Sequence, residues 1–187
     1  MSSSPWPDHL LTLEDWERLP EDTSRHYELA EGVMHVAPRP ILRHQRASWR
    51  LAAQLEHQLH AEWGAVIDTE VIIEPGPPAT VRAPDVLVVP DAAIAAGRPR
   101  VVPAEVLLAI EIVSAGSGRV DRVTKLSEYA GAGIEHYWIV DLTEPVDMVA
   151  YRLIDGNYEE VARGSGLVVV DSPSRLAIDL PALVAPR

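Results

Sequence analysis

The chain has 187 residues, 47% of them hydrophobic, and a formal net charge of −12. This length is enough for one domain with a sizeable core, and the absence of cysteine excludes disulfides and thiolate metal sites. No signal peptide or bilayer-spanning apolar run is visible, so we expect a cytoplasmic protein without membrane contact, and the acidic charge counts against tight nucleic-acid binding.

The N-terminal part of the sequence predicts a short helix followed by a hairpin. Thr12 followed by Asp15 is an N-cap pattern, and Pro20 ends the helix that it opens. Alternating apolar residues with an intervening Glu-Gly turn predict two paired strands over 26–30 and 33–37.

A long amphipathic helix is predicted to follow, ending near residue 62. Its inward face, at about 100° per residue, would hold Ile41, Ser48, Ala52, Leu55 and Leu59. Its opposite face carries Arg39, Arg43, Arg46, Arg50 and His57. That face is either a solvated surface or a phosphate-binding stripe of Arg43, Arg46 and Arg50. His44 lies beside it, either as a partly exposed surface histidine or as an auxiliary residue of a site.

The second half of the chain is rich in strand patterns. Strands are predicted over 66–75, 81–89, 105–114, 135–141, 167–170 and 176–178, with a hairpin of 146–154 and 158–162. The proline-rich stretch 90–103 predicts a loop, and a helix capped by Ser117 is expected over 119–130. The order predicts a mixed α/β (α+β) fold, with residues 1–9 as a flexible tail and 10–187 as a single domain.

Three residues of unusual placement indicate a chemistry. Asp85 and Glu111 each lie in an apolar segment of strand character, where an acid is costly to bury unless it is paired or holds a metal. Lys125, in the helix that follows, is the only lysine beside fifteen arginines. One or two carboxylates suffice to hold Mg²⁺, and a nearby ammonium can stabilise charge on a phosphate. The trio predicts metal-dependent hydrolysis of a phosphodiester.

Each residue of this trio also has a purely structural interpretation, which the spacing leaves open. Asp85 can cap a strand end, and Glu111 can pair with an arginine. Lys125 lies four residues after Asp121 and can form a surface ion pair worth only a few tenths of a kcal/mol.

Four strings carry a resemblance to a known family: H-Y-E-L-A-E-G, R-A-P-D-V-L-V-V, L-A-I-E-I-V-S and D-R-V-T-K-L-S-E-Y-A-G-A-G-I-E-H-Y-W-I-V-D. Together they resemble the Uma-type family of restriction-endonuclease-like proteins, long described as a domain of unknown function within the PD-(D/E)XK nuclease superfamily. The resemblance covers roughly residues 10–180, and its last string is the most specific.

The resemblance implies a restriction-endonuclease-like central mixed sheet flanked by helices, with hairpins near both ends. It further implies a Mg²⁺-dependent nuclease, with Mn²⁺ able to substitute, acting on nucleic acid, most simply DNA. Asp85 and Glu111 would hold the metal and Lys125 would complete the catalytic set. The superfamily pattern places its lysine at position 113, where this chain has Val113, and Lys125 matches the position to which the family is expected to have moved it. Glu28 matches a family acid in the first hairpin, as an auxiliary residue.

Three functions remain open from the sequence. The first is a Mg²⁺-dependent endonuclease, which the superfamily habit of pairing protomers would make a homodimer. The second is an inactive nuclease fold used for binding or assembly, which the acidic charge and the absent Glu-x-Lys lysine favour. The third is a small-molecule phosphoesterase, for which Gly116-Ser117-Gly118 ahead of a helix is the only candidate phosphate loop.

Overall fold

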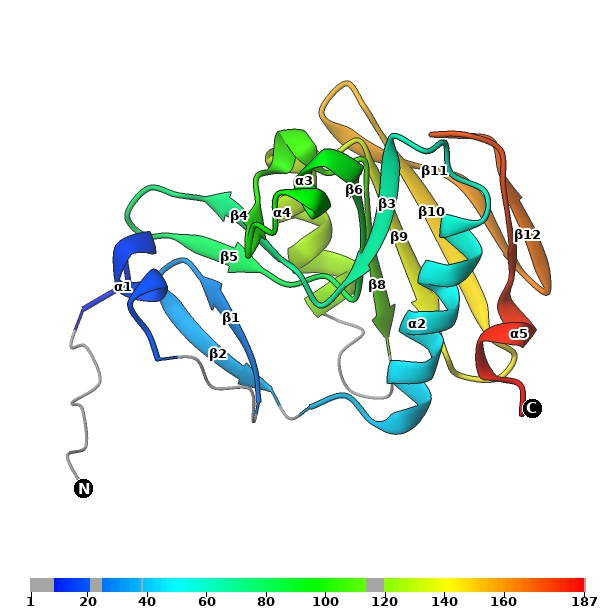
Figure 1. The fold of residues 1–187 in the computed structure, drawn as a ribbon, viewed down its shortest axis with the longest axis horizontal. Coiled ribbons are helices and arrows are strands. Elements are labelled where there is room, and N and C mark those ends of the chain that lie inside the picture. Colours follow the sequence, from blue (N-terminus) through cyan, green and yellow to red (C-terminus); the bar gives the residue numbers. More distant parts are fainter. Residues whose placement is uncertain (1–8, 21–24, 38, 114–119, 187) are drawn as a thin grey trace.

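Strands from all parts of the chain assemble into three sheets, with helices packed against the largest of them (Figure 1). The computed structural model describes residues 9–20, 25–37, 39–113 and 120–186. The strands are β1 (His26–Ala30), β2 (Val33–Ala37), β3 (Trp63–Ile67), β4 (Glu70–Glu74), β5 (Thr80–Arg82), β6 (Val86–Pro90), β7 (Arg100–Val101), β8 (Leu108–Val113), β9 (His136–Asp141), β10 (Asp147–Ile154), β11 (Asn157–Ser165), β12 (Leu167–Val170) and β13 (Leu176–Asp179). The helices are α1 (Leu13–Glu17), α2 (Leu42–Glu56), α3 (Asp91–Ala95), α4 (Leu126–Gly131) and α5 (Leu180–Val184), with the 3₁₀ turn η1 (Pro103–Glu105) and the π-helical turn η2 (Val120–Lys125).

The largest sheet has six strands in the order β11-β10-β9-β8-β6-β3. Adjacent strands within this sheet are antiparallel except for β8 and β9, which run parallel and are connected through η2 and α4. A second sheet of five strands has the order β2-β1-β5-β4-β7, and β12 pairs with β13. The predicted mixed α+β fold is confirmed, although the strands divide among separate sheets.

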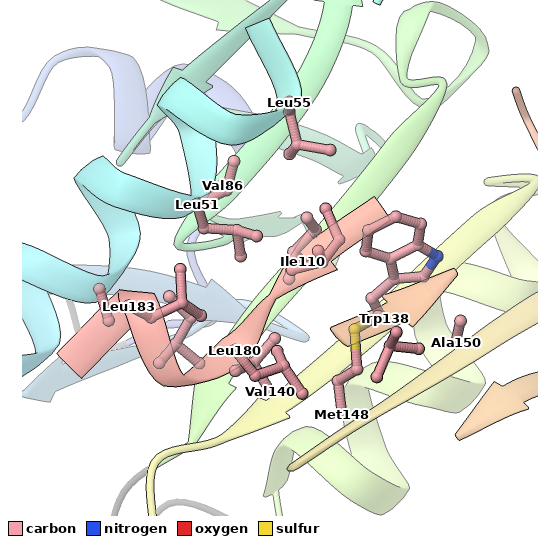
Figure 2. Packing of buried hydrophobic residues seen from close by; sticks show 14 of the residues in the cluster. Leu51, Leu55, Val86, Ile110, Trp138, Val140, Met148, Ala150, Leu180 and Leu183 are labelled. Carbon is pink, nitrogen blue, oxygen red and sulfur yellow. The ribbon is translucent and has the colours of Figure 1, made fainter. Parts of the chain in front are cut away.

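The six-stranded sheet is covered on both faces, as the apolar residues on both faces of β8 predicted. Alternate residues of the central strands point to opposite faces, so the two cores are separate. The α2-side core includes Leu51, Leu55, Val86, Ile110, Trp138, Met148, Leu180 and Leu183, whose side chains from α2, α5 and the sheet point toward one another (Figure 2). The α4-side core includes Val71, Leu87, Ala109, Val113, Tyr129, Tyr137 and Ile139, drawn from the sheet, α4 and β4.

Helix α2 buries a face slightly different from the predicted one. Its buried residues are His44, Ala47, Ser48, Leu51, Ala52 and Leu55. Ile41 was assigned to that face but is 66% exposed. It is the extended residue that precedes the helix, with ψ 162°, so helical periodicity does not apply to it. The helix also ends at Glu56 rather than near residue 62, because the chain turns back to begin β3 at Trp63.

Three other boundaries differ from the sequence prediction. The strand predicted over 66–75 is broken by a turn at Asp68, whose φ is +52°, so it forms the ends of β3 and β4. The predicted loop 90–103 contains the short helix α3 and strand β7. The helix predicted over 119–130 begins as a π-helical turn and becomes α-helical only at Leu126. Its predicted cap, Ser117, and the candidate phosphate loop around it lie outside the described residues.

The end regions follow the predicted pattern more closely. Thr12 and Asp15 form the expected capping box at the start of α1, with the Asp15 amide donating to the Thr12 hydroxyl at 3.1 Å. The predicted C-terminal hairpin is present, with β11 extended to Ser165. Within the described residues, no helix is both long and apolar enough to cross a membrane.

Candidate active site

Glu111 points from the middle of β8 toward α4. Its neighbours in the alternation, Ala109 and Val113, pack in the α4-side core, whereas Leu108 and Ile110 pack in the α2-side core. Glu111 is only 3% exposed, so its charge requires partners inside the protein.

Asp85 lies directly before β6 and next to Glu111 in the register of the sheet. Val86 pairs with Ile110 in the antiparallel β6–β8 ladder, so extending that register by one residue sets Asp85 opposite Glu111, on the same face. The Ile112 amide donates to Asp85 Oδ2 at 2.7 Å. Within the described parts of the chain, no group donates a hydrogen bond to the other oxygen, Oδ1. Asp85 therefore has one oxygen held by the backbone and one available to a ligand.

Lys125 is the last residue of the π-helical turn, and its ammonium reaches back to Glu111. Its Nζ lies 2.9 Å from Glu111 Oε1 and 2.9 Å from Glu28 Oε1, and the residue is 6% exposed. Lys125 is thus buried between two carboxylates, which rules out the surface ion pair that the sequence left open. π-Helical turns occur frequently at functional sites.

Tyr129, one turn after Lys125, donates from Oη to the same oxygen, Glu111 Oε1, at 2.8 Å. Burial first, and the Glu111 charge second, raise the pKa of Tyr129 well above its ordinary value. Its hydroxyl therefore remains a neutral donor. Two donors on Oε1 orient the Glu111 carboxylate rigidly.

Glu28 is linked to a buried arginine that the sequence analysis did not single out. The β1–β5 pairing of Leu29 with Val81 places Glu28 opposite Arg82, whose Nη1 donates to Glu28 Oε2 at 3.0 Å. Arg82 is 3% exposed and also forms a two-pronged contact with Glu128, both at 2.7 Å. Burial alone would raise the pKa of Glu28, but the charges of Lys125 and Arg82 outweigh it and hold that pKa below its ordinary value.

His44 is buried against Asp85, which excludes the partly exposed surface histidine, one of the two interpretations that the sequence left open. It is 8% exposed, and its Nε2 lies 2.8 Å from the Ile112 carbonyl oxygen and 3.3 Å from Asp85 Oδ2. A carbonyl only accepts, so Nε2 carries the hydrogen. His44 therefore joins α2 to the end of β8 and to Asp85.

A cleft of about 660 Å³ opens beside these residues, between the first hairpin and α2. It is lined by Arg25, His26, Tyr27, Arg39, Pro40, His44, Gln45, Ser48, Ile67, Asp68, Glu70, Ala83 and Asp85. Of the predicted trio only Asp85 lines it, while Glu111 and Lys125 are buried. The hydrogen bond of His26 to Asp68, at 3.2 Å, raises the pKa of His26 against the opposing effect of burial.

The arginines predicted to bind phosphate do not line this cleft. Arg43 pairs with Glu144, and Arg50 Nη1 donates to the carbonyls of Ala182 and Ala185 at 2.7 Å each. Arg50 thereby satisfies carbonyls at the end of α5, which have no partner within a helix. Arg46 is exposed on the outer face of α2. The arginines on the lining of the cleft are Arg25 and Arg39.

The charge balance of the site is compatible with a divalent cation. Three carboxylates, those of Glu28, Glu111 and Glu128, contact the Arg82 guanidinium or the Lys125 ammonium, and Asp85 adds a fourth beside His44. The excess of two negative charges equals the charge of one Mg²⁺ ion, which prefers carboxylate oxygens. Within the described residues, no group of three or more His, Cys, Asp and Glu side chains forms a ready-made metal cage. A two-carboxylate Mg²⁺ site, completed by waters, does not need one.

Two signals could have identified the residues that the sequence analysis missed. Arg82 lies three positions before Asp85 in an apolar segment of strand character. A charged residue among apolar strand residues is the same pattern that singled out Glu111. Tyr129 lies four residues after Lys125, on the same face of a helix.

Comparisons with known proteins agree with this fold. A family model described as "Uma2: Putative restriction endonuclease" matches residues 13–182. A crystal structure of "a putative nuclease belonging to DUF820" from Anabaena variabilis ATCC 29413 has the same fold, with a TM-score of 0.71 and 18% sequence identity. The match covers 93% of this chain and 97% of that one. No curated protein sequence matches this chain.

Proposed function

Since this chain belongs to the Uma2 family of putative restriction endonucleases, we propose that its site hydrolyses phosphodiester bonds in nucleic acid with Mg²⁺ as cofactor. The observation that carries the proposal is the 2.9 Å contact of Lys125 Nζ with Glu111 Oε1, on the sheet face that also holds Asp85. Lys125 contacts Glu111, and strand register sets Asp85 opposite Glu111, so an ammonium and two carboxylates from three separate segments occupy neighbouring positions. Such a constellation suits a phosphate whose charge increases during the reaction.

The two carboxylates of the sheet are the groups that would hold the metal. Asp85 offers Oδ1, while Glu111 is oriented by two donors on its Oε1. When bound, Mg²⁺ supplies charge neutralisation and lowers the pKa of a coordinated water. Mn²⁺ has the same preference for oxygen ligands and should substitute.

Lys125 and His44 take different roles in this proposal. Lys125 is a buried cation held by two acids, so it acts as a fixed positive charge behind the carboxylates of the site rather than as a base. His44 donates from Nε2, which faces Asp85 Oδ2 and the backbone, and therefore positions Asp85. Neither role requires a thiol or hydroxyl nucleophile.

The cations on the cleft lining support nucleic acid, with DNA the simplest substrate. Arg25 and Arg39 line the cleft together with Asp85, and His26 adds positive charge below its raised pKa. Guanidinium groups bind phosphate oxygens in two-pronged geometry. The lining also carries the acids Asp68, Glu70 and Asp85, so Arg25 and Arg39 are local contacts for a phosphate within a surface that is not positive as a whole.

A small-molecule phosphoesterase is the second candidate, because a cleft of about 660 Å³ is the size of a typical small-ligand pocket. Substrate choice separates the two functions. Supercoiled plasmid, a short single strand and a mononucleotide would each be incubated with the protein and Mg²⁺. Cleavage of a polymer supports the nuclease, and release of phosphate from the mononucleotide alone supports the phosphoesterase.

Metal binding is tested separately from cleavage by titration calorimetry with Mn²⁺. We expect heat from the wild type and none from Asp85→Asn, which removes one ligand charge but keeps the side-chain size. Asp91→Asn, an exposed acid on α3, is the matched control. Equal binding by the wild type and Asp85→Asn would refute the metal site.

A further inference from the structure

The outer face of α2 carries a stripe of apolar and charged residues that nothing in the proposed reaction uses. Leu42, Arg46, Trp49, Ala53 and Glu56 recur at helical spacing and share this face. Leu42 is 84% exposed and Trp49 is 59% exposed. Single exposed apolar residues are ordinary, but adjoining ones mark an interaction surface.

A groove lies beside this stripe and is built to receive an apolar side chain. It has a volume of about 600 Å³ and lies between α2 and the turn from β3 to β4. Its lining includes Trp49, Ala52, Ala53, Ala65 and Ile67. The three alanines leave room above the helix, and Ile67 is itself 46% exposed.

We propose that this groove is occupied by Trp49 of a second copy of the same chain, with the two α2 helices packed antiparallel about a two-fold axis. An axis passing between Trp49 and Ala53 pairs residues whose numbers sum to 102. Trp49 then lies against Ala53 of the second copy, a large side chain on a small one. Two-fold symmetry produces the same contact twice, which makes the surface self-complementary.

The charges on the stripe match in the same pairing. Arg46 and Glu56 also sum to 102, so each arginine faces the glutamate of the second copy on both sides of the axis. Glu56 is exposed, and its Oε1 already accepts from the Ala65 amide, which orients the carboxylate. Helices that cross at a small angle, about 20°, keep such pairs within reach over this length.

A second copy fits this groove better than a nucleic-acid strand does. The groove lining contains an acid, Glu56, and no arginine or lysine, so it would repel a phosphate. Ile67 lines both this groove and the cleft that holds Asp85. The two-fold arrangement therefore sets one cleft on each side of the interface, which, on the proposed function, suits cutting both strands of a duplex.

Sedimentation equilibrium of the full chain, over a range of protein concentrations, tests the proposal. We expect a dimer for the wild type, and a dissociation constant raised by about 100-fold or more for Trp49→Glu, which buries a charge at the centre of the interface. Leu167→Glu adds the same single negative charge at an exposed apolar residue of β12, outside the groove, and should leave the dissociation constant unaltered. A monomeric wild type at about 100 μM would overturn the proposal, since specific dimers are normally far tighter than that.

A charge exchange provides the sharper test, because only the antiparallel pairing predicts rescue. Arg46→Glu alone and Glu56→Arg alone each place like charges together and should weaken the dimer about 10-fold or more. The double variant restores opposite charges and should recover most of the affinity. Circular dichroism checks that Glu56→Arg still folds without its contact to the Ala65 amide. Glu56→Gln keeps an acceptor for that amide and removes the charge, so its dimer dissociation constant provides a second measurement. A double variant as weak as the singles would refute this pairing, whatever cleavage the protein shows.

Discussion

Replacing Lys125 by methionine should destabilise the protein strongly and in a pH-dependent manner. The ammonium touches Glu28 Oε1 and Glu111 Oε1, each at 2.9 Å, and is 6% exposed. Methionine fills similar space but leaves two buried carboxylates facing each other. Removing one partner of a buried ion pair costs about 3–5 kcal/mol of unfolding free energy. A domain of ordinary stability, about 5–15 kcal/mol, would still fold.

The loss of unfolding free energy caused by Lys125→Met should become smaller as the pH falls. In the wild type the pKa of Glu28 is lowered, because the charges of Lys125 and Arg82 outweigh burial. Its share of stability is therefore present above the unfolded pKa of 4.5 and is lost as pH falls. Without Lys125, burial should instead raise the carboxylate pKa, so that protonation at lower pH relieves the repulsion. The difference in unfolding free energy between the wild type and Lys125→Met should be largest near about pH 8 and smaller near about pH 5.

Urea unfolding followed by circular dichroism, at several pH values, measures this effect. The matched control is Arg98→Met, which removes a cation from the exposed pair with Glu105. Exposed pairs contribute about 0.2–1 kcal/mol, so this control should lose little stability. The reasoning would be refuted if Lys125→Met lost no more stability than Arg98→Met, or if its deficit did not change with pH.

Three further predictions concern the same network. Asp68→Asn keeps a residue type that tolerates φ +52° but removes the charge beside His26. The pKa of His26 should therefore fall, and stability should be lost mainly below its unfolded pKa of 6.5 and not at higher pH; an unchanged His26 titration by NMR would contradict this. Tyr129→Phe removes one donor to Glu111 and should cost about 1–2 kcal/mol in urea unfolding while lowering kcat more than it alters KM; full activity would exclude its positioning role. Arg82→Lys cannot reproduce the two-pronged contact with its acids and should lose about 3 kcal/mol of stability, so a loss as small as that of Arg98→Lys would count against the buried network.

Local patterns in the sequence were sufficient to single out the charged residues around which the candidate site is built. Glu111 stood out because a carboxylate inside a wholly apolar strand needs a partner, and its partners are the ammonium of Lys125 and the hydroxyl of Tyr129. Asp85 stood out for the same reason. The mixed fold also followed from the order of the elements, since strand and helix periods are properties of short segments.

Helix faces and arginine roles could be predicted only in part. Periodicity identified the inward residues Ser48 and Leu55, but it could not decide whether His44 was exposed, and the end of β8 in fact covers it. The sequence could not distinguish a phosphate-binding arginine from a structural one. Arg50 contacts the end of α5, more than 130 residues away along the chain, and no local pattern contains that contact.

The sequence by itself therefore determined which residues carry unusual charge, because the cost of burying an acid depends on the apolar character of its immediate neighbours. Only the tertiary structure decided which of these charges meet. The register of β1 against β5 joins Glu28 to Arg82, and the π-helical turn directs Lys125 onto Glu111. Strand register and helix direction are set by packing between distant segments, where each position depends on the whole core rather than on adjacent residues.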